Sequence, residues 1–129
     1  MPVTNINIPV NITDEFIENL ICTMLEGGSN YWIRYVKVKD KLNGEPAATW
    51  VARQINNNLS VEITTDDDEV KRLNKDKIIR GILRWISEYP EHVSFETAYG
   101  HLEIDGGNID AGEADIILQF ALFGEIVYG

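Results

Sequence analysis

Apolar and polar positions along the chain predict three helices, the clearest of them near the N-terminus. Between residues 16 and 25, apolar side chains recur at i, i+1, i+4, i+5, i+8 and i+9, which is the spacing of one buried helix face. Thr13 is placed to cap this helix, and the two acidic residues after it suit the positive end of the helix dipole. The glycines at 27–28 then stop it.

A second helix is predicted to begin near Asn74 and to end at Pro90. Gly81 lies inside it and weakens it by about 1 kcal/mol relative to alanine. The apolar residues share one face, which we expect to be buried. That face consists of Ile78, Ile79, Ile82, Leu83, Ile86 and Tyr89.

The last helix is apolar on almost every side. Asp110 can cap it, Glu113 can complete an Asp-x-x-Glu capping box, and Gly124 ends it. Only Asp115 and Gln119 interrupt the apolar surface, one turn apart. We therefore expect this helix to form the centre of the core, although one of its two apolar faces could instead meet another subunit. The faces are Ala114, Ile117, Leu118, Ala121 and Leu122, and Ile116, Phe120 and Phe123.

Alternation and β-branched or aromatic residues predict strands. The predicted strands are 3–10, 31–39, 48–55 and 59–64, an irregular one at 95–99 in an otherwise loop-like segment, and a short one at 125–128. Pro9 suggests that the first is an edge strand. The third and fourth would form a hairpin around the asparagines at 56–58, whereas 40–46 and 65–69 are predicted loops. The expected fold is a single α+β domain over residues 1–129, with three helices packed on a small, mostly antiparallel sheet of three to five strands.

Composition fits a globular protein, because 44% of the 129 residues are hydrophobic and 25% are charged. Cys22 is the single cysteine, so no intrachain disulfide can form. The start of the chain lacks a signal-peptide pattern, and no apolar run approaches the ~20 residues of a membrane span. A cytoplasmic protein that does not enter a membrane is therefore predicted. A net charge of −10 disfavours direct binding to nucleic acid and permits binding to a basic protein surface.

Motifs for catalysis or metal binding were not found in the sequence. His92 and His101 stand outside any zinc-ligand spacing. The acidic stretch 105–115 fails the spacing of an EF-hand, and helix capping explains its carboxylates better. Nucleophile motifs are absent, and Cys22 is interpreted as a packing residue. We therefore predict no catalytic residue, no metal and no cofactor.

Two polar segments stand out as a candidate binding site. The turn at 28–32 presents an amide, a phenol and an indole between a helix and a strand. Asp115 and Gln119 need hydrogen-bond partners on a buried helix, so we expect side-chain contact between them and this turn. The contact could be purely structural, with the indole in the core, or it could border a small ligand pocket. The tentative binding residues are Asn30, Tyr31, Trp32, Asp115 and Gln119.

The same two segments carry a resemblance. LEGGSNYWI at 25–33 and GEADIILQFALFGEIVYG at 112–129 resemble a group of small uncharacterised proteins encoded by bacteriophages and mobile elements, often from gut bacteria. The matching motifs cover about thirty residues in a fixed order. The resemblance implies a phage or prophage context, in which roles against host defence or on host machinery are common. It carries no biochemical activity.

Three functional hypotheses follow from these observations. The first is a non-enzymatic interaction protein that acts on a host protein, with anti-defence as one form of that role. The second is a small-ligand-binding protein with a pocket between the Asn30 turn and the last helix. An enzyme ranks third, because no acid–base or nucleophilic constellation is visible. The sequence leaves homo-oligomerisation open.

Overall fold

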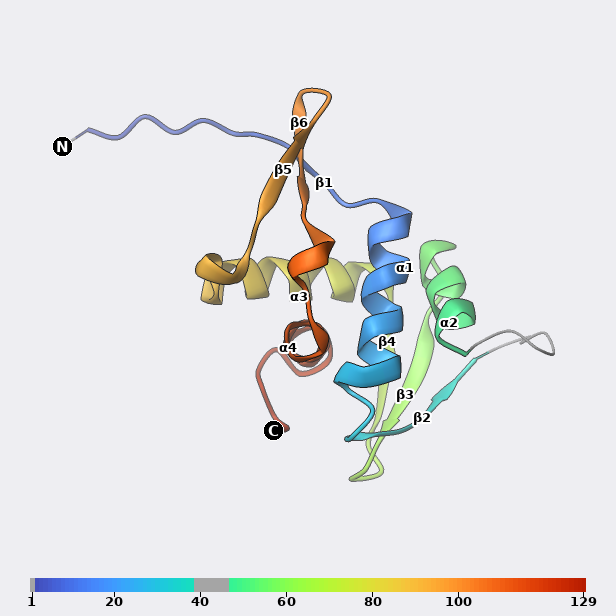
Figure 1. Ribbon diagram of the computed structural model, residues 1–129. Helices are drawn as coiled ribbons and strands as arrows, with labels where there is room; N and C mark the ends of the chain where they lie inside the picture. The colour runs from blue at the N-terminus through green and yellow to red at the C-terminus, as the bar shows by residue number, and fades with distance from the viewer. Residues whose placement is uncertain (1, 39–46) are drawn as a thin grey trace.

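The computed structural model describes residues 2–38 and 47–129, which form four α-helices and two three-stranded sheets (Figure 1). The helices are α1 (Asp14–Thr23), α2 (Ala47–Asn56), α3 (Lys75–Glu88) and α4 (Ala111–Phe123). The strands are β1 (Val10–Asn11), β2 (Ile33–Lys37), β3 (Val61–Thr65), β4 (Val70–Leu73), β5 (Phe95–Ala98) and β6 (His101–Ile104). The predicted α+β class is confirmed, with one helix more than predicted and two small sheets in place of one.

The two sheets differ in how their strands pair. In the first sheet, β3 lies between β2 and β4 and pairs antiparallel with both. In the second, β6 lies between β1 and β5, parallel to β1 and antiparallel to β5. Figure 1 shows the β5–β6 hairpin standing out from the body, whereas the first sheet lies beside α1 and α2. Most of the pairing is therefore antiparallel, as predicted.

Helix α4 lies at the centre of the hydrophobic core. Ile117 and Leu118 are fully buried, which confirms their predicted place in the core. Helix α4 packs against α3, against α1 and against the π-helical turn Met24–Gly28 that extends α1. The bulky buried indoles of Trp32 and Trp85 belong to the same cluster. The apolar C-terminal helix is thus core, as its pattern predicted.

Gly81 lies where α3 crosses α4. A Cβ at this position would lie 2.5 Å from the carbonyl oxygen of Ile117 and 3.0 Å from the Cβ of Ala121. Side chains do not approach a backbone oxygen so closely, so the two helices can only meet here because residue 81 lacks a Cβ. The weak helix propensity of glycine is offset by this close packing.

The predicted caps Thr13 and Asp110 form, and Asn74 caps α3 in the same way. The side chains of Thr13, Asn74 and Asp110 each accept a hydrogen bond from the backbone N–H three residues on, at 3.0, 2.9 and 2.9 Å. Gly124 ends α4 in the left-handed region at φ 72°. The first, third and fourth helices therefore begin within one or two residues of their predicted starts.

The predicted capping box at the start of α4 is only half formed. Asp110 caps the helix, but the carboxylate of Glu113 turns toward α3. It accepts a hydrogen bond from the indole of Trp85 at 2.5 Å and lies 2.7 Å from Nδ1 of His92. Because the buried Trp85 needs an acceptor, Glu113 serves a tertiary contact in place of the local one.

The prediction of a strand at 48–55 is wrong, because these residues belong to α2. Their β-branched residues suggested a strand, but the buried side chains recur at i, i+3, i+4 and i+7, which is a helix pattern. The predicted hairpin with residues 59–64 is wrong for the same reason. Instead β3 pairs with β2 and with β4, a short strand that the sequence did not reveal. The buried apolar positions of α2 are Ala48, Val51, Ala52 and Ile55, and Gln54 is buried as well.

Smaller differences concern the ends of the chain and the hairpin. Of the predicted strand 3–10, only its last residue lies in β1, and the segment 125–128 forms no strand. The region around 95–104 forms a regular hairpin, β5–β6, in place of one irregular strand. Leu83 is 60% exposed and does not belong to the buried face of α3. The predicted loop 40–46 lies outside the described residues.

Among the described helices, none combines the length and the apolar character that crossing a bilayer requires.

Candidate functional site

Asp115 is the centre of a buried hydrogen-bond network that joins α4 to the turn before β2. Its Oδ1 accepts from the hydroxyl of Ser29 at 2.8 Å and from the indole N–H of Trp32 at 2.7 Å. Its Oδ2 accepts from the hydroxyl of Tyr31 at 2.8 Å and from the amide of Gln119 at 3.1 Å. The predicted contact between the turn and the polar stripe of α4 is therefore confirmed. We call this set of five side chains the junction.

The π-helical turn places the junction residues against α4. The N–H of Ser29 donates to the carbonyl of Met24 at 2.7 Å, which closes the wide turn. A Cβ on Gly28 would lie 2.5 Å from the carbonyl oxygen of Ala111. Gly28 thus allows the turn to rest directly on the first residue of α4, and this contact brings Ser29 within reach of Asp115.

The C-terminal segment closes the other side of the junction. The side-chain oxygen of Gln119 accepts from the backbone N–H groups of Val127 and Tyr128 at 2.7 and 2.8 Å. Its amide nitrogen donates to the carbonyl of Tyr128 at 3.1 Å. The ring of Tyr128 stacks on Trp32 with centroids 5.0 Å apart, and its hydroxyl donates to Asp67 at 2.8 Å. A side-chain amide thus takes the place of a strand partner for the backbone of Val127 and Tyr128.

Four of the five predicted site residues meet at the junction, but Asn30 does not. Asn30 is exposed and lines a separate hollow of about 440 Å³ between β2 and α2. Sequence analysis missed Ser29 and Tyr128, although a hydroxyl beside Asn30 and an aromatic residue near the chain end were available signals. Because the junction groups bond to one another and to the C-terminal segment, its geometry favours a structural role. The small-ligand pocket stays a prediction.

The junction also changes the acidity of Tyr31. Burial of the hydroxyl, followed by its hydrogen bond to Asp115 and the negative charge there, raises the pKa of Tyr31 to about 12. The phenol is therefore protonated at neutral pH and donates its proton to the carboxylate. Neither group is arranged as an activated nucleophile or general base.

A groove of about 830 Å³ lies between α1 and the β5–β6 hairpin. Its lining carboxylates come from α1, the π-helical turn and the hairpin. Among the described residues that line it, none is a lysine or arginine. We call this hollow the acidic groove, after its carboxylates Glu15, Glu26, Glu96, Glu103 and Asp105.

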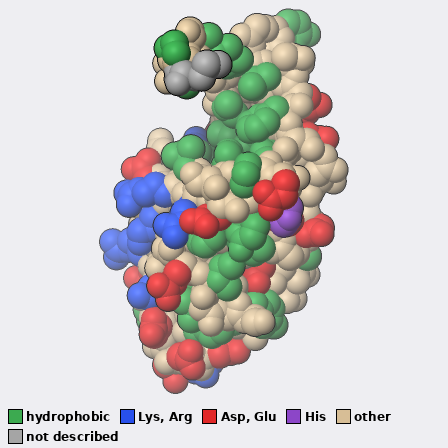
Figure 2. Space-filling model, turned by 90° about the vertical axis from the view of Figure 1, so that its left-hand side faces the viewer, with side chains coloured by type: hydrophobic (Ala, Val, Ile, Leu, Met, Phe, Trp, Pro, Cys, Tyr) green, Lys and Arg blue, Asp and Glu red, His purple; other side chains and the backbone are tan. Residues whose placement is uncertain are grey.

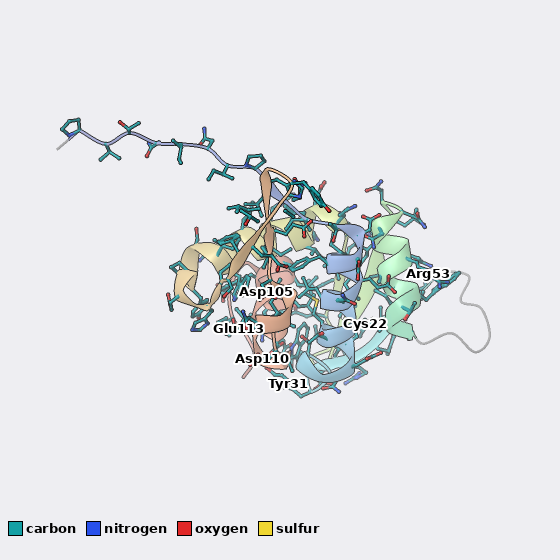
Figure 3. The ribbon with its side chains drawn as sticks, turned by 45° about the horizontal axis from the view of Figure 1, so that its top comes forward. Cys22, Tyr31, Arg53, Asp105, Asp110 and Glu113 are labelled. Atoms are coloured by element: carbon teal, nitrogen blue, oxygen red, sulfur yellow. The ribbon has the colours of Figure 1, made fainter. Side chains whose placement is uncertain are left out.

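The floor of the acidic groove is apolar. Phe16 and Leu20 contribute from α1, and Ile104 and Ile109 contribute from the opposite wall. Cys22 is half-buried at its border, and Figure 3 shows Cys22 and Asp105 coming from different elements. Burial, followed by the charge of Glu26, raises the pKa of the Cys22 thiol, which makes it a poor nucleophile at neutral pH.

Two of the groove carboxylates face each other across the hairpin. Glu96 on β5 and Glu103 on β6 are directly paired in the antiparallel register, and both line the groove. Like charges in this relation destabilise a strand pair. His101 Nε2 lies 3.5 Å from a Glu103 oxygen.

Other carboxylates of this region have local structural roles. Asp105 accepts from the backbone N–H of Gly107 at 3.0 Å and from the amide of Asn108 at 3.2 Å. Asp110 caps α4. Across the described ranges, no group of three or more His, Cys, Asp or Glu side chains is positioned to hold a metal ion.

Positive charge gathers on a different surface. Figure 2 shows lysine and arginine side chains collected on one flank of the molecule. Lys77, Arg80 and Arg84 of α3 line a shallow hollow of about 540 Å³ together with apolar residues of α4. Although the net charge is −10, positive and negative side chains are not evenly mixed: basic residues of α3 line one hollow, and acidic residues line the groove beside α1.

Comparison of the chain with protein-family models, with curated proteins and with solved structures found no significant match.

Proposed function

We propose that this is a non-enzymatic interaction protein whose acidic groove binds a basic segment of a partner protein. The groove combines five carboxylates with an apolar floor in a hollow of about 830 Å³. A segment with lysine or arginine beside an apolar anchor complements both features. Electrostatic attraction of this kind speeds association, while the apolar floor supplies most of the binding energy.

The observation that carries this proposal is the facing pair of Glu96 and Glu103. Each carboxylate raises the electrostatic cost of the other in the free protein, and a cationic side chain between them would remove that cost. The resemblance to phage and mobile-element proteins makes a host protein the expected partner. Interference with host defence is one activity that such binding would support.

A titration with a defined peptide tests the groove. We expect a peptide of alternating lysine and leucine to shift the amide resonances of groove residues in a two-dimensional NMR spectrum. A control peptide in which glutamate replaces every lysine should leave these resonances unchanged. The double variant Glu96→Gln/Glu103→Gln should bind the basic peptide roughly tenfold more weakly, a loss of about 1.4 kcal/mol.

A matched variant separates local from general electrostatics. Glu91→Gln/Glu125→Gln changes the net charge equally but lies outside the lining of the groove. We expect it to bind the basic peptide like the native protein. Equal weakening in both double variants would mean that the peptide responds only to net charge, and the proposed function would then lose its support.

A further inference from the structure

Residues 2–9 leave the body of the protein as an extended arm (Figure 1). The side chains of Val3 and Ile6 are each 79% exposed, and that of Ile8 is 51% exposed. Within the described part of the chain, residues 2–8 make no backbone hydrogen bond, and the arm is tied only at its end, where Leu102 N–H donates to the Pro9 carbonyl. The arm therefore has the conformation of a strand but lacks a strand partner.

The second sheet is too short to pair the arm. Strand β1 runs parallel to β6, with Val10 opposite Leu102. Upstream of Leu102 the chain reaches His101 and then turns back at Gly100 into β5. Arm residues that precede Pro9 therefore have no β6 residue opposite them. An unpaired strand of this kind is a template for pairing with another chain.

The arm also lacks the charges that keep free strands apart. Edge strands are commonly protected by lysine or other charged side chains. Residues 2–13 contain none, although the chain as a whole carries a net charge of −10. The arm can thus approach a second copy of this acidic protein with little electrostatic repulsion, and it exposes β-branched side chains that favour strand pairing.

The arm sequence is complementary to itself. We propose that the arms of two copies pair antiparallel about Ile6 and form a homodimer. In this register Ile6 faces Ile6, Thr4 faces Ile8, and Asn5 faces Asn7. All β-branched side chains of the paired region then share one face and all asparagines share the other, because side chains alternate along a strand.

The prolines confine the pairing to the residues between them, and facing isoleucines favour the register about Ile6. Pro2 and Pro9 cannot donate to a strand ladder, and pairing about Ile6 keeps both outside the five central residues. Sliding one strand by one residue would place Asn5 or Asn7 against Ile6 and mix the two faces. Each arm continues into β1, so the dimer joins the β1–β6–β5 sheets of two copies. The contact is small, and such interfaces are weak.

Cysteine trapping tests the register. All variants carry Cys22→Ser, so that only the introduced thiol can react. Ile6→Cys places two thiols directly opposite each other, at the ~5 Å Cα separation that a disulfide needs. Val3→Cys places them six residues apart along the strands, or roughly 20 Å. We expect Ile6→Cys to form a disulfide-linked dimer at least tenfold faster, and equal rates would overturn the proposal.

Mass in solution tests the dimer itself. At high protein concentration, sedimentation equilibrium of the native chain should give a mass that approaches twice the 14.6 kDa of one chain. Deletion of residues 2–9 and the variant Ile6→Asp should both give monomers. Leu59→Asp, which adds the same charge at an exposed apolar residue elsewhere, should leave the mass unchanged.

The bond from Leu102 N–H to the Pro9 carbonyl is the one backbone hydrogen bond that the structure describes for residues 2–9, so the arm variants should fold, and circular dichroism checks that they do. A native chain that is monomeric at every concentration would overturn the proposal. So would a dimer that survives deletion of the arm. Neither result depends on the acidic groove, so failure here and failure of the proposed function are distinguishable.

Discussion

Replacing Asp115 with alanine should be among the most damaging single changes in this chain. The substitution removes the acceptor of four hydrogen bonds at the junction. Ser29 is 0% exposed and Trp32 is 1% exposed, so water cannot take the place of the lost carboxylate at either donor. Each buried donor without a partner costs ~1–3 kcal/mol, and the expected loss is therefore roughly 2–6 kcal/mol. Tyr31 is half-exposed and can bond to water instead.

Asp115→Asn provides the matched comparison. The asparagine oxygen can still accept from Ser29 and Trp32, but its NH₂ group would point toward the amide nitrogen of Gln119. Gln119 cannot rotate to relieve this, because its oxygen already accepts from two N–H groups of the C-terminal segment. The Tyr31 hydroxyl can reverse and accept. One donor conflict remains, at a cost of about 1–3 kcal/mol.

Urea denaturation followed by tryptophan fluorescence measures both losses. We expect the free energy of unfolding to be highest for the native protein, lower for Asp115→Asn and lowest for Asp115→Ala. Similar slopes of this free energy against urea concentration would show that the unfolded states are comparable. A loss below about 1 kcal/mol for Asp115→Ala would contradict the assignment of the carboxylate as the acceptor of buried donors. An Asn variant less stable than the Ala variant would contradict it as well.

Three further outcomes are expected. Ile117→Ala should lower the free energy of unfolding by ~2–5 kcal/mol because the side chain is fully buried, and a loss below half a kcal/mol in calorimetry would place α4 at the periphery. Gly81→Ala should lower the melting temperature despite the better helix propensity of alanine, because its Cβ would lie 2.5 Å from the Ile117 carbonyl oxygen. Gly27→Ala is the control: its Cβ would have its nearest contact at 3.8 Å, so the melting temperature should change little. The pKa of Tyr31 is raised from 10.0 to about 12, so the protonated phenol is favoured by folding, and its stabilisation should be complete below pH 10 and lost as pH rises to 12. Tyr31→Phe should weaken this alkaline loss in stability measured against pH, and an unchanged profile would exclude Tyr31 as its source.

The helices that could be predicted from the sequence are those with local start and stop signals. Thr13 and Asp110 act as side-chain caps, and Gly124 ends α4, so these boundaries depend on residues close in sequence. Helix α2 lacks a described cap, and its β-branched residues favoured a strand. Its buried face is set by packing against α1, and packing of that kind can override propensity.

Strand pairing was harder to predict because it depends on long-range partners. β3 alternates clearly and was found, but β4 has only four residues and is a strand because β3 lies beside it. The C-terminal segment has the residue types of a strand, yet the amide of Gln119 bonds the backbone of Val127 and Tyr128 in place of a strand partner. Neither outcome could be inferred from neighbours in sequence.

Part of the junction could be predicted because its two central polar residues stand out in the sequence of α4 alone. A carboxylate and an amide on an otherwise apolar helix require partners, and the turn at 28–32 offered donors. The choice of Asn30 was wrong as a structural contact, because the π-helical turn rotates Ser29 toward Asp115 and leaves Asn30 exposed. The acidic groove was not predictable, since its carboxylates come from positions between 15 and 105 that only the fold brings together.

The junction and the acidic groove therefore differ in what explains their polar residues. Every carboxylate oxygen of Asp115 accepts hydrogen bonds from the chain itself, so folding accounts for the residue without any ligand. Glu96 and Glu103 face each other in the register of the hairpin, where like charges destabilise a strand pair. The motifs at 25–33 and 112–129 supply the junction, whereas these two glutamates lie outside both motifs. A search for the function of this protein is therefore directed to the groove and to the basic protein segment that we propose as its ligand.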